Sequence, residues 1–123
     1  MEFNFDNNIP IYIQIVEIIK KDIISGKLKP EEKLPSVRVY ANILKVNPNT
    51  MQKALNELEE LKLIFTERTN GKYVTNDIDL IKYYKYTHAN SIVNKYFNDM
   101  NLIGINKIEA IKYILEKSDN KWI

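Results

Sequence analysis

The 123-residue sequence contains no cysteine, one histidine and three glycines. The absence of cysteine excludes disulfides, thiolate nucleophiles and Cys-ligated zinc. The sequence also has no phosphate-binding loop and no recognisable motif of paired acids, which argues against an enzyme. We therefore expect no catalytic site, no metal and no cofactor.

Long hydrophobic runs are missing as well. No apolar run approaches the length that spans a membrane, and the first residues lack both the basic start and the apolar stretch of a signal peptide. Together with the absence of cysteine, which fits a reducing compartment, this predicts a cytoplasmic protein with no membrane partner.

An excess of charge of one sign is also absent. The formal net charge is +2, with 11 basic and 10 acidic residues in residues 1–76 and 7 and 6 in residues 77–123. Net charge alone therefore does not argue for a nucleic-acid partner, and any such case depends on motif and geometry. With 45% hydrophobic and 28% charged residues, the chain has the composition of an ordinary folded domain.

Helical periodicity dominates the N-terminal half. Three helices are expected, over residues 10–25, 37–44 and 48–61, with Ser36 and Asn47 as the N-caps of the second and third. Only two residues separate the second helix from the cap of the third. This short connection is the one that a helix-turn-helix requires.

A β-hairpin is predicted directly after the third helix. The β-prone runs 63–66 and 72–75 flank Asn70-Gly71, a pair that can supply both positive φ angles of a type I′ turn. Helix, helix, short turn, helix and hairpin make a winged helix-turn-helix. We therefore predict a mostly α fold with a small β-hairpin, in which residues 1–76 form the DNA-binding domain.

Residues 77–123 are expected to form a short dimerisation segment of two helices, the first capped by Asp77 or Asp79 and the second begun by Asn106 with Glu109. The first helix has an apolar stripe that one short following helix cannot cover, so a second copy of the chain is expected to bury it. The predicted interface residues are Ile81, Tyr84, His88, Ile92, Tyr96 and Met100 on the first helix, and Ile108, Ile111 and Leu115 on the second.

The third helix has the size and composition of a recognition helix. Its apolar residues form one face, which leaves polar side chains near the outside, at Asn49, Thr50, Gln52, Lys53 and Asn56. Asn and Gln can bond adenine bidentately, and Lys can reach guanine or a phosphate. This pattern predicts a helix that enters the major groove of DNA.

These motifs together resemble the GntR family of bacterial transcription regulators, and its short YtrA-like subfamily in particular. The resemblance is dense over residues 8–75. It is carried by Pro10-Ile11-Tyr12-Ile13-Gln14, Leu34-Pro35-Ser36-Val37-Arg38, Val46-Asn47-Pro48-Asn49-Thr50-Met51-Gln52-Lys53-Ala54 and Gly71-Lys72-Tyr73-Val74.

The resemblance implies roles for individual residues. Arg38 is expected to contact the DNA backbone or a base edge, and Ser36 to cap its helix and touch phosphate. Gly71 corresponds to the wing-tip glycine that approaches the minor groove, with Asn70 and Lys72 beside it. The DNA-reading stretch of the family corresponds to Asn47, Asn49, Thr50, Gln52 and Lys53.

The sequence departs from the family pattern at several glycines. Glu31 follows Pro30 where the family usually has Gly, Lys62 replaces the Gly that ends the third helix, and Thr69 replaces the first wing Gly. A lysine in a left-handed helix cap costs on the order of 1 kcal/mol relative to Gly, so a different helix end is one expectation.

The function predicted from these features is that of a sequence-specific transcriptional regulator, a repressor that binds an inverted-repeat operator as a homodimer. A small-molecule effector is left open. The alternative is a winged-helix adaptor that binds proteins, which the low net charge permits. An outward helix face of Asn, Thr, Gln and Lys with no large apolar residue favours DNA.

Plainer structural explanations exist for several of these residues. Arg38 and Lys53 can be solvated surface charges, and Asn47 is fully explained as a helix cap. A lone histidine on an apolar stripe, such as His88, is usually packed and not a metal ligand or pH switch. The tyrosines of the C-terminal segment can line an effector pocket, but aromatic residues at helical spacing more often serve packing or dimerisation.

Overall fold

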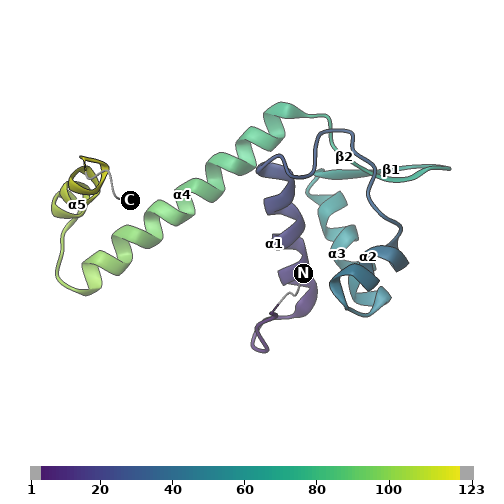
Figure 1. Cartoon of the computed structure of the whole chain (residues 1–123), viewed down its shortest axis with the longest axis horizontal. Coiled ribbons are helices and arrows are strands. Elements are labelled where there is room, and N and C mark those ends of the chain that lie inside the picture. The colour runs from purple at the N-terminus through teal and green to yellow at the C-terminus, as the bar shows by residue number, and fades with distance from the viewer. Residues whose placement is uncertain (1–3, 120–123) are drawn as a thin grey trace. The chain divides into compact units, whose positions relative to one another are not determined.

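The computed structural model describes residues 4–119 and confirms the predicted fold class (Figure 1). It divides into two compact units, one ending at Lys85 and one beginning at Tyr86. The elements are α1 (Ile11–Ile24), α2 (Val37–Leu44), α3 (Pro48–Glu60), β1 (Ile64–Glu67), β2 (Gly71–Val74), α4 (Ile78–Leu102) and α5 (Lys107–Asp119). Helix α4 begins in the first unit and ends in the second.

The first unit has one hydrophobic core centred on α3. Helix α3 contacts α1, α2 and β1, and its residues Met51, Leu55 and Leu58 are completely buried, as are Ile15 and Ile19 of α1. Burying such a side chain contributes about 1.5–3 kcal/mol, so the α1–α3 contact is a main source of stability. The inward and outward faces of α3 are therefore fixed, and its polar side is left for other contacts.

The helix N-termini follow the predicted capping residues. The Ser36 side chain accepts a hydrogen bond from the Val39 amide at 3.3 Å, and that of Asn47 accepts one from the Asn49 amide at 2.7 Å. Of the two caps considered for α4, the structure uses Asp77. Each such cap stabilises its helix by about 1 kcal/mol, because it satisfies a backbone donor that has no partner inside the helix.

Helix α3 ends in a left-handed residue although that residue is a lysine. Lys62 has a φ of 62°, its amide donates to the carbonyl of Glu59 at 2.9 Å, and the next amide, of Leu63, donates to the carbonyl of Leu58 at 3.1 Å. This is the hydrogen-bond pattern of a Schellman motif. The expectation of a different helix end is thus wrong, and Lys62 and Glu31 both adopt the positive φ that glycine would adopt more easily.

The hairpin forms as predicted, but its turn does not. Its register pairs Glu67 with Gly71, so three residues connect the strands, and the Asn70 amide donates to the Glu67 carbonyl at 3.3 Å. Only Gly71 of the Asn70-Gly71 pair has a positive φ, 98°. The predicted type I′ turn is therefore wrong. The structure has a three-residue connection in which a glycine with positive φ follows the turn.

The segment before α2 covers the free edge of β2. The Glu31 and Leu34 amides donate to carbonyls of β2 at 3.0 and 2.8 Å, and the Val74 amide donates to the carbonyl of Glu32 at 2.9 Å. An isolated bridge pairs Lys33 with β2. Residues 31–34 thus behave as a third, short strand, which ties the β1–β2 hairpin, the wing, to the start of α2.

The second unit has almost no interior. Within its described part, Ala110 of α5 is the only hydrophobic side chain that is buried, and Tyr96 of α4 donates to the carbonyl of that residue at 2.6 Å. The capping prediction for α5 is confirmed, since Asn106 accepts a hydrogen bond from the Glu109 amide at 2.9 Å. Large apolar side chains are exposed here, namely Tyr86, Ile92, Val93, Leu102, Ile103, Ile108, Ile111, Tyr113, Ile114 and Leu115.

Candidate nucleic-acid interface

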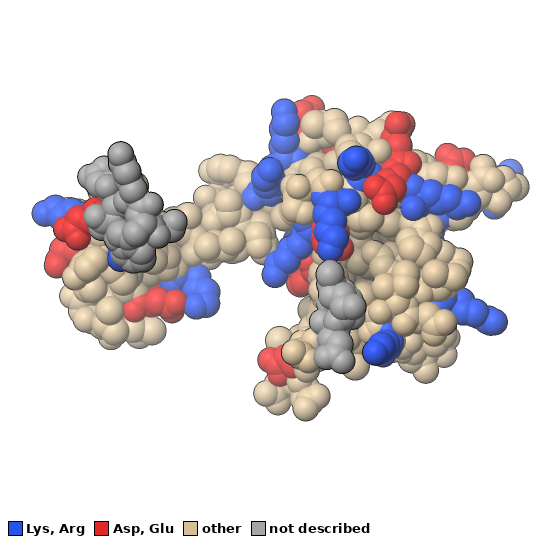
Figure 2. All heavy atoms as spheres, viewed as in Figure 1, with Lys and Arg blue, Asp and Glu red and all other residues tan. Residues whose placement is uncertain are grey.

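On the face that Figure 2 presents, the first unit carries both basic and acidic side chains, which are mixed over its upper part. No large patch of charge of one sign, which could attract DNA from a distance, is visible on this face. Binding to a polyanion would depend on individual cations that have no acidic neighbour. In the first unit, Lys27 forms an ion pair with Asp22 and Lys72 forms one with Glu59; in the second unit, Lys95 pairs with Asp99.

The outward side of α3 carries a hydrogen-bonded pair of amides. The Gln52 side chain donates to the Asn56 side chain at 2.8 Å, one helical turn further along. Asn49 is exposed at the start of the helix, and Thr50 beside it is half-buried. The predicted reading residues therefore lie together near the N-terminal end of α3, and Gln52 has a side-chain partner one turn along the helix.

Lys53 occupies a position that the sequence does not predict. Its ammonium lies over the ring of Tyr12 in α1, 4.1 Å from the ring centroid, while the residue as a whole is exposed. A cation–π contact at an exposed site contributes about 0.5–1 kcal/mol. The contact holds the Lys53 charge beside the first turn of α1.

Helix α2 has a buried side that faces the core and an exposed, polar first turn. Tyr40 faces the core, and burial together with the charges of Asp22 and Glu32 raises the pKa of Tyr40 to about 12. Ser36 and Arg38, at the first turn, are exposed, and Arg38 forms no ion pair within residues 4–119. Arg38 is thus a cation available to a phosphate or a base edge.

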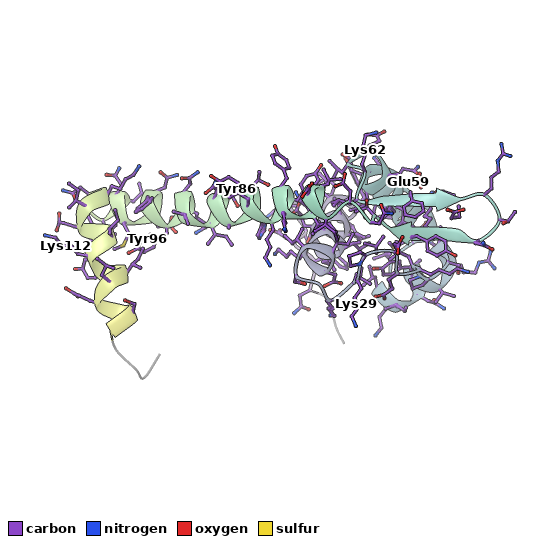
Figure 3. All side chains as sticks on the ribbon, turned by 90° about the horizontal axis from the view of Figure 1, so that it is seen from above. Lys29, Glu59, Lys62, Tyr86, Tyr96 and Lys112 are labelled. Atoms are coloured by element: carbon purple, nitrogen blue, oxygen red, sulfur yellow. The ribbon has the colours of Figure 1, made fainter. Side chains whose placement is uncertain are left out.

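The wing is attached to α3 by an ion pair. Lys72 of β2 donates to the Glu59 carboxylate of α3 and, at 2.9 Å, to the hydroxyl of Thr66 in β1; Figure 3 labels Glu59 beside the hairpin. The Lys72 side chain is only 17% exposed. Burial raises the pKa of Glu59, but hydrogen bonds from Lys72 and Thr66 and the Lys72 charge outweigh it, so that pKa lies below its ordinary value.

A groove of about 520 Å³ lies between the wing and the start of α2. Its lining includes four predicted DNA-binding residues, Ser36, Asn70, Gly71 and Lys72. Lys33 joins them from the segment that pairs with β2. The fold therefore brings two separate parts of the sequence, residues 33–37 and the hairpin residues 66–72, to one groove.

Sequence reasoning missed two members of this region. Lys33 directly precedes the Leu34-Pro35-Ser36 motif, and its basic character at that position is the signal that could have identified it. Glu59 is one polar residue among several at the end of α3, and nothing in the sequence singles out its pairing with Lys72, 13 residues later. These roles depend on pairing between segments that are distant in the sequence.

The predicted dimerisation residues fall into two groups. Ile81 and Tyr84 are half-buried against the core of the first unit, and the Tyr84 hydroxyl donates to the carbonyl of Leu61 at 3.2 Å. Of the rest, His88, Tyr96 and Met100 are half-buried, and Ile92, Ile108, Ile111 and Leu115 are exposed. Tyr96, labelled in Figure 3, joins α4 to α5.

Residues 4–119 hold neither a cluster of metal ligands nor a helix suited to a membrane. No three His, Asp or Glu side chains of this part lie close enough together to hold a metal ion. Within the same residues, no helix combines the length and the apolar character needed to cross a bilayer.

Comparison with known proteins gives a consistent result. The family model "Bacterial regulatory proteins, gntR family" matches residues 11–74. The chain is 32% identical over 93% of its length to "Uncharacterized HTH-type transcriptional regulator YhcF" of Bacillus subtilis (strain 168), of which the match covers 94%. It is 46% identical over 55% of its length to "HTH-type transcriptional repressor YtrA" of the same organism, of which the match covers 52%.

Solved structures agree with the sequence relatives. A "GntR family transcriptional regulator from Listeria monocytogenes" is 39% identical and superposes with a TM-score of 0.83, over 91% of this chain and 98% of that one. A structure titled "Crystal Structure of AraR(DBD) in complex with operator ORR3" is 25% identical, with a TM-score of 0.53, over 61% of this chain and 90% of that one.

Proposed function

The chain belongs to the GntR family of bacterial regulatory proteins, and from that premise we propose that it is a homodimeric repressor that binds an inverted-repeat operator. It is a YtrA-like transcriptional regulator with a winged helix-turn-helix DNA-binding domain, and it is not an enzyme. The repressor role is supported by the name of its relative YtrA, and operator binding by the AraR complex.

The proposed DNA contacts lie on the first unit. Asn49, Thr50 and Gln52 read base edges in the major groove, because their polar groups lie at the start of α3 and on its outward side. Arg38 and Lys53 contact phosphates. Backbone groups and short polar side chains make the remaining contacts to the sugar–phosphate backbone of the DNA. They belong to Ser36, Asn47, Asn70 and Gly71.

Dimerisation is proposed for the second unit, and one observation carries it. This unit buries only Ala110 among its described hydrophobic side chains, while Ile92 is 58% and Ile108 70% exposed. An apolar surface of this kind is unusual on a monomer and typical of a subunit interface. A second copy that packs the same faces together removes them from water through a closed two-fold contact.

Two-fold symmetry has a consequence for the operator. The two α3 helices of a symmetric dimer read two half-sites in opposite directions, so the operator is an inverted repeat. With recognition helices on one side of the duplex, the half-site centres lie about 34–36 Å apart, roughly one helical turn.

The alternative, a winged helix that binds another protein, has one observation in its favour. Helix α2 exposes two aliphatic side chains, with Val39 51% and Ile43 52% accessible. Two separate side chains on one short helix form only a small patch, whereas protein partners usually bury a larger apolar centre. The polar outward side of α3 favours DNA.

A salt titration distinguishes the two functions. Fluorescence anisotropy of a labelled random-sequence duplex should report binding whose log affinity falls linearly with log salt, with a slope of about −0.9 for each phosphate neutralised. Lack of measurable duplex binding at low salt would contradict the proposed function and favour the adaptor. Bovine albumin of similar concentration serves as the control for non-specific effects on the probe.

A further inference from the structure

The groove beside the wing combines an apolar floor with polar edges. Leu34 is buried and Pro35 and Val37 are half-buried, so these three line its deeper part. Lys33 and Asn70 are exposed at its edges. A nucleic-acid strand has matching chemistry, since its sugars present apolar edges and its phosphates present charge.

Lys33, from the segment before α2, lies against Gly71 of the wing. Its Cε lies 3.6 Å from where a Cβ on Gly71 would be, so the end of the lysine stem lies at van der Waals distance from that position. Lys33 forms no ion pair within the described residues, and no carboxylate there lies within 4.0 Å of its ammonium. Its charge is therefore uncompensated at the edge of the groove.

Lys72 lines the same groove but is engaged elsewhere. Its ammonium is shared between the Glu59 carboxylate and the Thr66 hydroxyl, and its side chain is largely buried. To contact a phosphate, Lys72 would have to leave a carboxylate partner, and Glu59 would then stand unpaired near the DNA. The arrangement suits Lys72 for holding the hairpin on α3.

We propose that the groove between the wing and α2 holds one sugar–phosphate strand of duplex DNA, with Lys33 as its phosphate contact and Lys72 as a positioning residue. This rests on the proposed function, because it assigns a contact within the DNA-binding surface. The proposal differs from the family resemblance in the roles of the two lysines. Lys72, which lies in the wing motif, orients the wing, and Lys33, which lies outside that motif, binds the phosphate.

The test compares two variants that differ in which lysine loses its charge. Lys33→Gln removes one unpaired cation, and the double variant Glu59→Gln/Lys72→Gln removes both members of the ion pair without changing the formal net charge. The probe is the duplex most enriched by the wild-type protein from a random-sequence pool. Affinity is measured over a range of salt concentrations, and circular dichroism checks that both variants remain folded.

Lys33→Gln should reduce the magnitude of the salt slope by about 0.9, the value for one phosphate contact, and weaken binding most at low salt. The double variant should keep the wild-type slope. An unchanged slope for Lys33→Gln, or a slope reduced by about 0.9 in the double variant, would overturn the assignment. Failure of the wild-type protein to enrich or bind any duplex would instead overturn the proposed function itself.

Discussion

At the scale of single residues, the left-handed lysine at the end of α3 shows how a local misfit is tolerated. Lys62 keeps a φ of 62° because the Schellman hydrogen bonds and the burial of Leu63 require the chain to turn there. A non-glycine residue in this conformation costs about 1–2 kcal/mol. Glycine avoids that cost but loses more backbone entropy on folding, about 0.5–1 kcal/mol.

Lys62→Gly should therefore raise the free energy of unfolding by about 0.5–1 kcal/mol. Urea denaturation monitored by circular dichroism measures the change. Lys62→Ala is the matched control, because it removes the same charge but keeps a Cβ, and it should give no gain. Equal stabilisation by Gly and Ala would show that charge, and not backbone conformation, sets the effect.

A second residue-scale prediction concerns Arg38, which is exposed and forms no ion pair in residues 4–119. Arg38→Ala should weaken duplex binding and reduce the magnitude of the salt slope by about 0.9, with the fold unchanged. The control is Lys82→Ala, which removes an exposed cation from α4. If both variants bind alike, Arg38 is an ordinary surface charge.

At the scale of elements, local signals predicted the helices well and long-range pairing explains what they missed. Helix starts were predictable because capping by Ser36, Asn47 and Asp77 involves residues only two or three positions apart. The turn of the hairpin could not be predicted from local sequence, because Ile64 and Val74 must both enter the core. Their pairing fixes the register and leaves three residues between the strands.

The same distinction applies to the candidate site. The sequence indicated the polar side of α3 and the exposed Arg38, since both follow from helical spacing. It did not indicate that Lys33 lies against Gly71 or that Lys72 pairs with Glu59, because those contacts form only after the wing folds onto the helices. Polar contacts between distant segments leave little trace in sequence periodicity.

The ion pair between α3 and the wing predicts a dependence on pH. The pKa of Glu59 is lower in the folded protein than its ordinary value, so the pair contributes stability above the unfolded pKa, about 4.3. This contribution is lost as the pH falls through the folded pKa. The unfolding midpoint of the wild-type protein should therefore exceed that of Glu59→Gln at neutral pH, and the difference should shrink in acid.

Thermal unfolding of both proteins between pH 7 and pH 3 measures this difference. Glu60→Gln is the control, because it removes an exposed carboxylate from the neighbouring position on α3, and its difference from wild type should stay smaller throughout. A Glu59→Gln difference that is the same at both pH values would contradict the assigned role of the pair.

At the scale of the whole molecule, α4 belongs to both units. Its start packs against the core of the first unit through Ile81, and the Tyr84 hydroxyl donates a hydrogen bond to the carbonyl of Leu61. The ammonium of Lys20 in α1 lies over the Tyr84 ring, 5.0 Å from its centroid. The two predicted stripe residues nearest the start of α4 thus already have partners within the chain. The dimer interface is expected to lie further along, at Ile92 and beyond.

Ile92→Glu should yield a monomer with a folded winged helix-turn-helix, because a buried unpaired charge opposes association. The monomer should lose most operator affinity, since a single half-site lacks the gain from linkage. Asn94→Glu, an exposed polar position two residues away, is the matched control and should remain dimeric. Light scattering that finds wild-type monomers at micromolar concentration would rule out the dimer.

The central claim, a two-fold symmetric reader of operator DNA, is tested most directly by sequencing the genomic fragments that the purified protein retains from its own organism. We expect an enriched motif that is an inverted repeat, with half-site centres about one helical turn apart. Retained fragments with no common motif, or with a single half-site or a direct repeat, would contradict it.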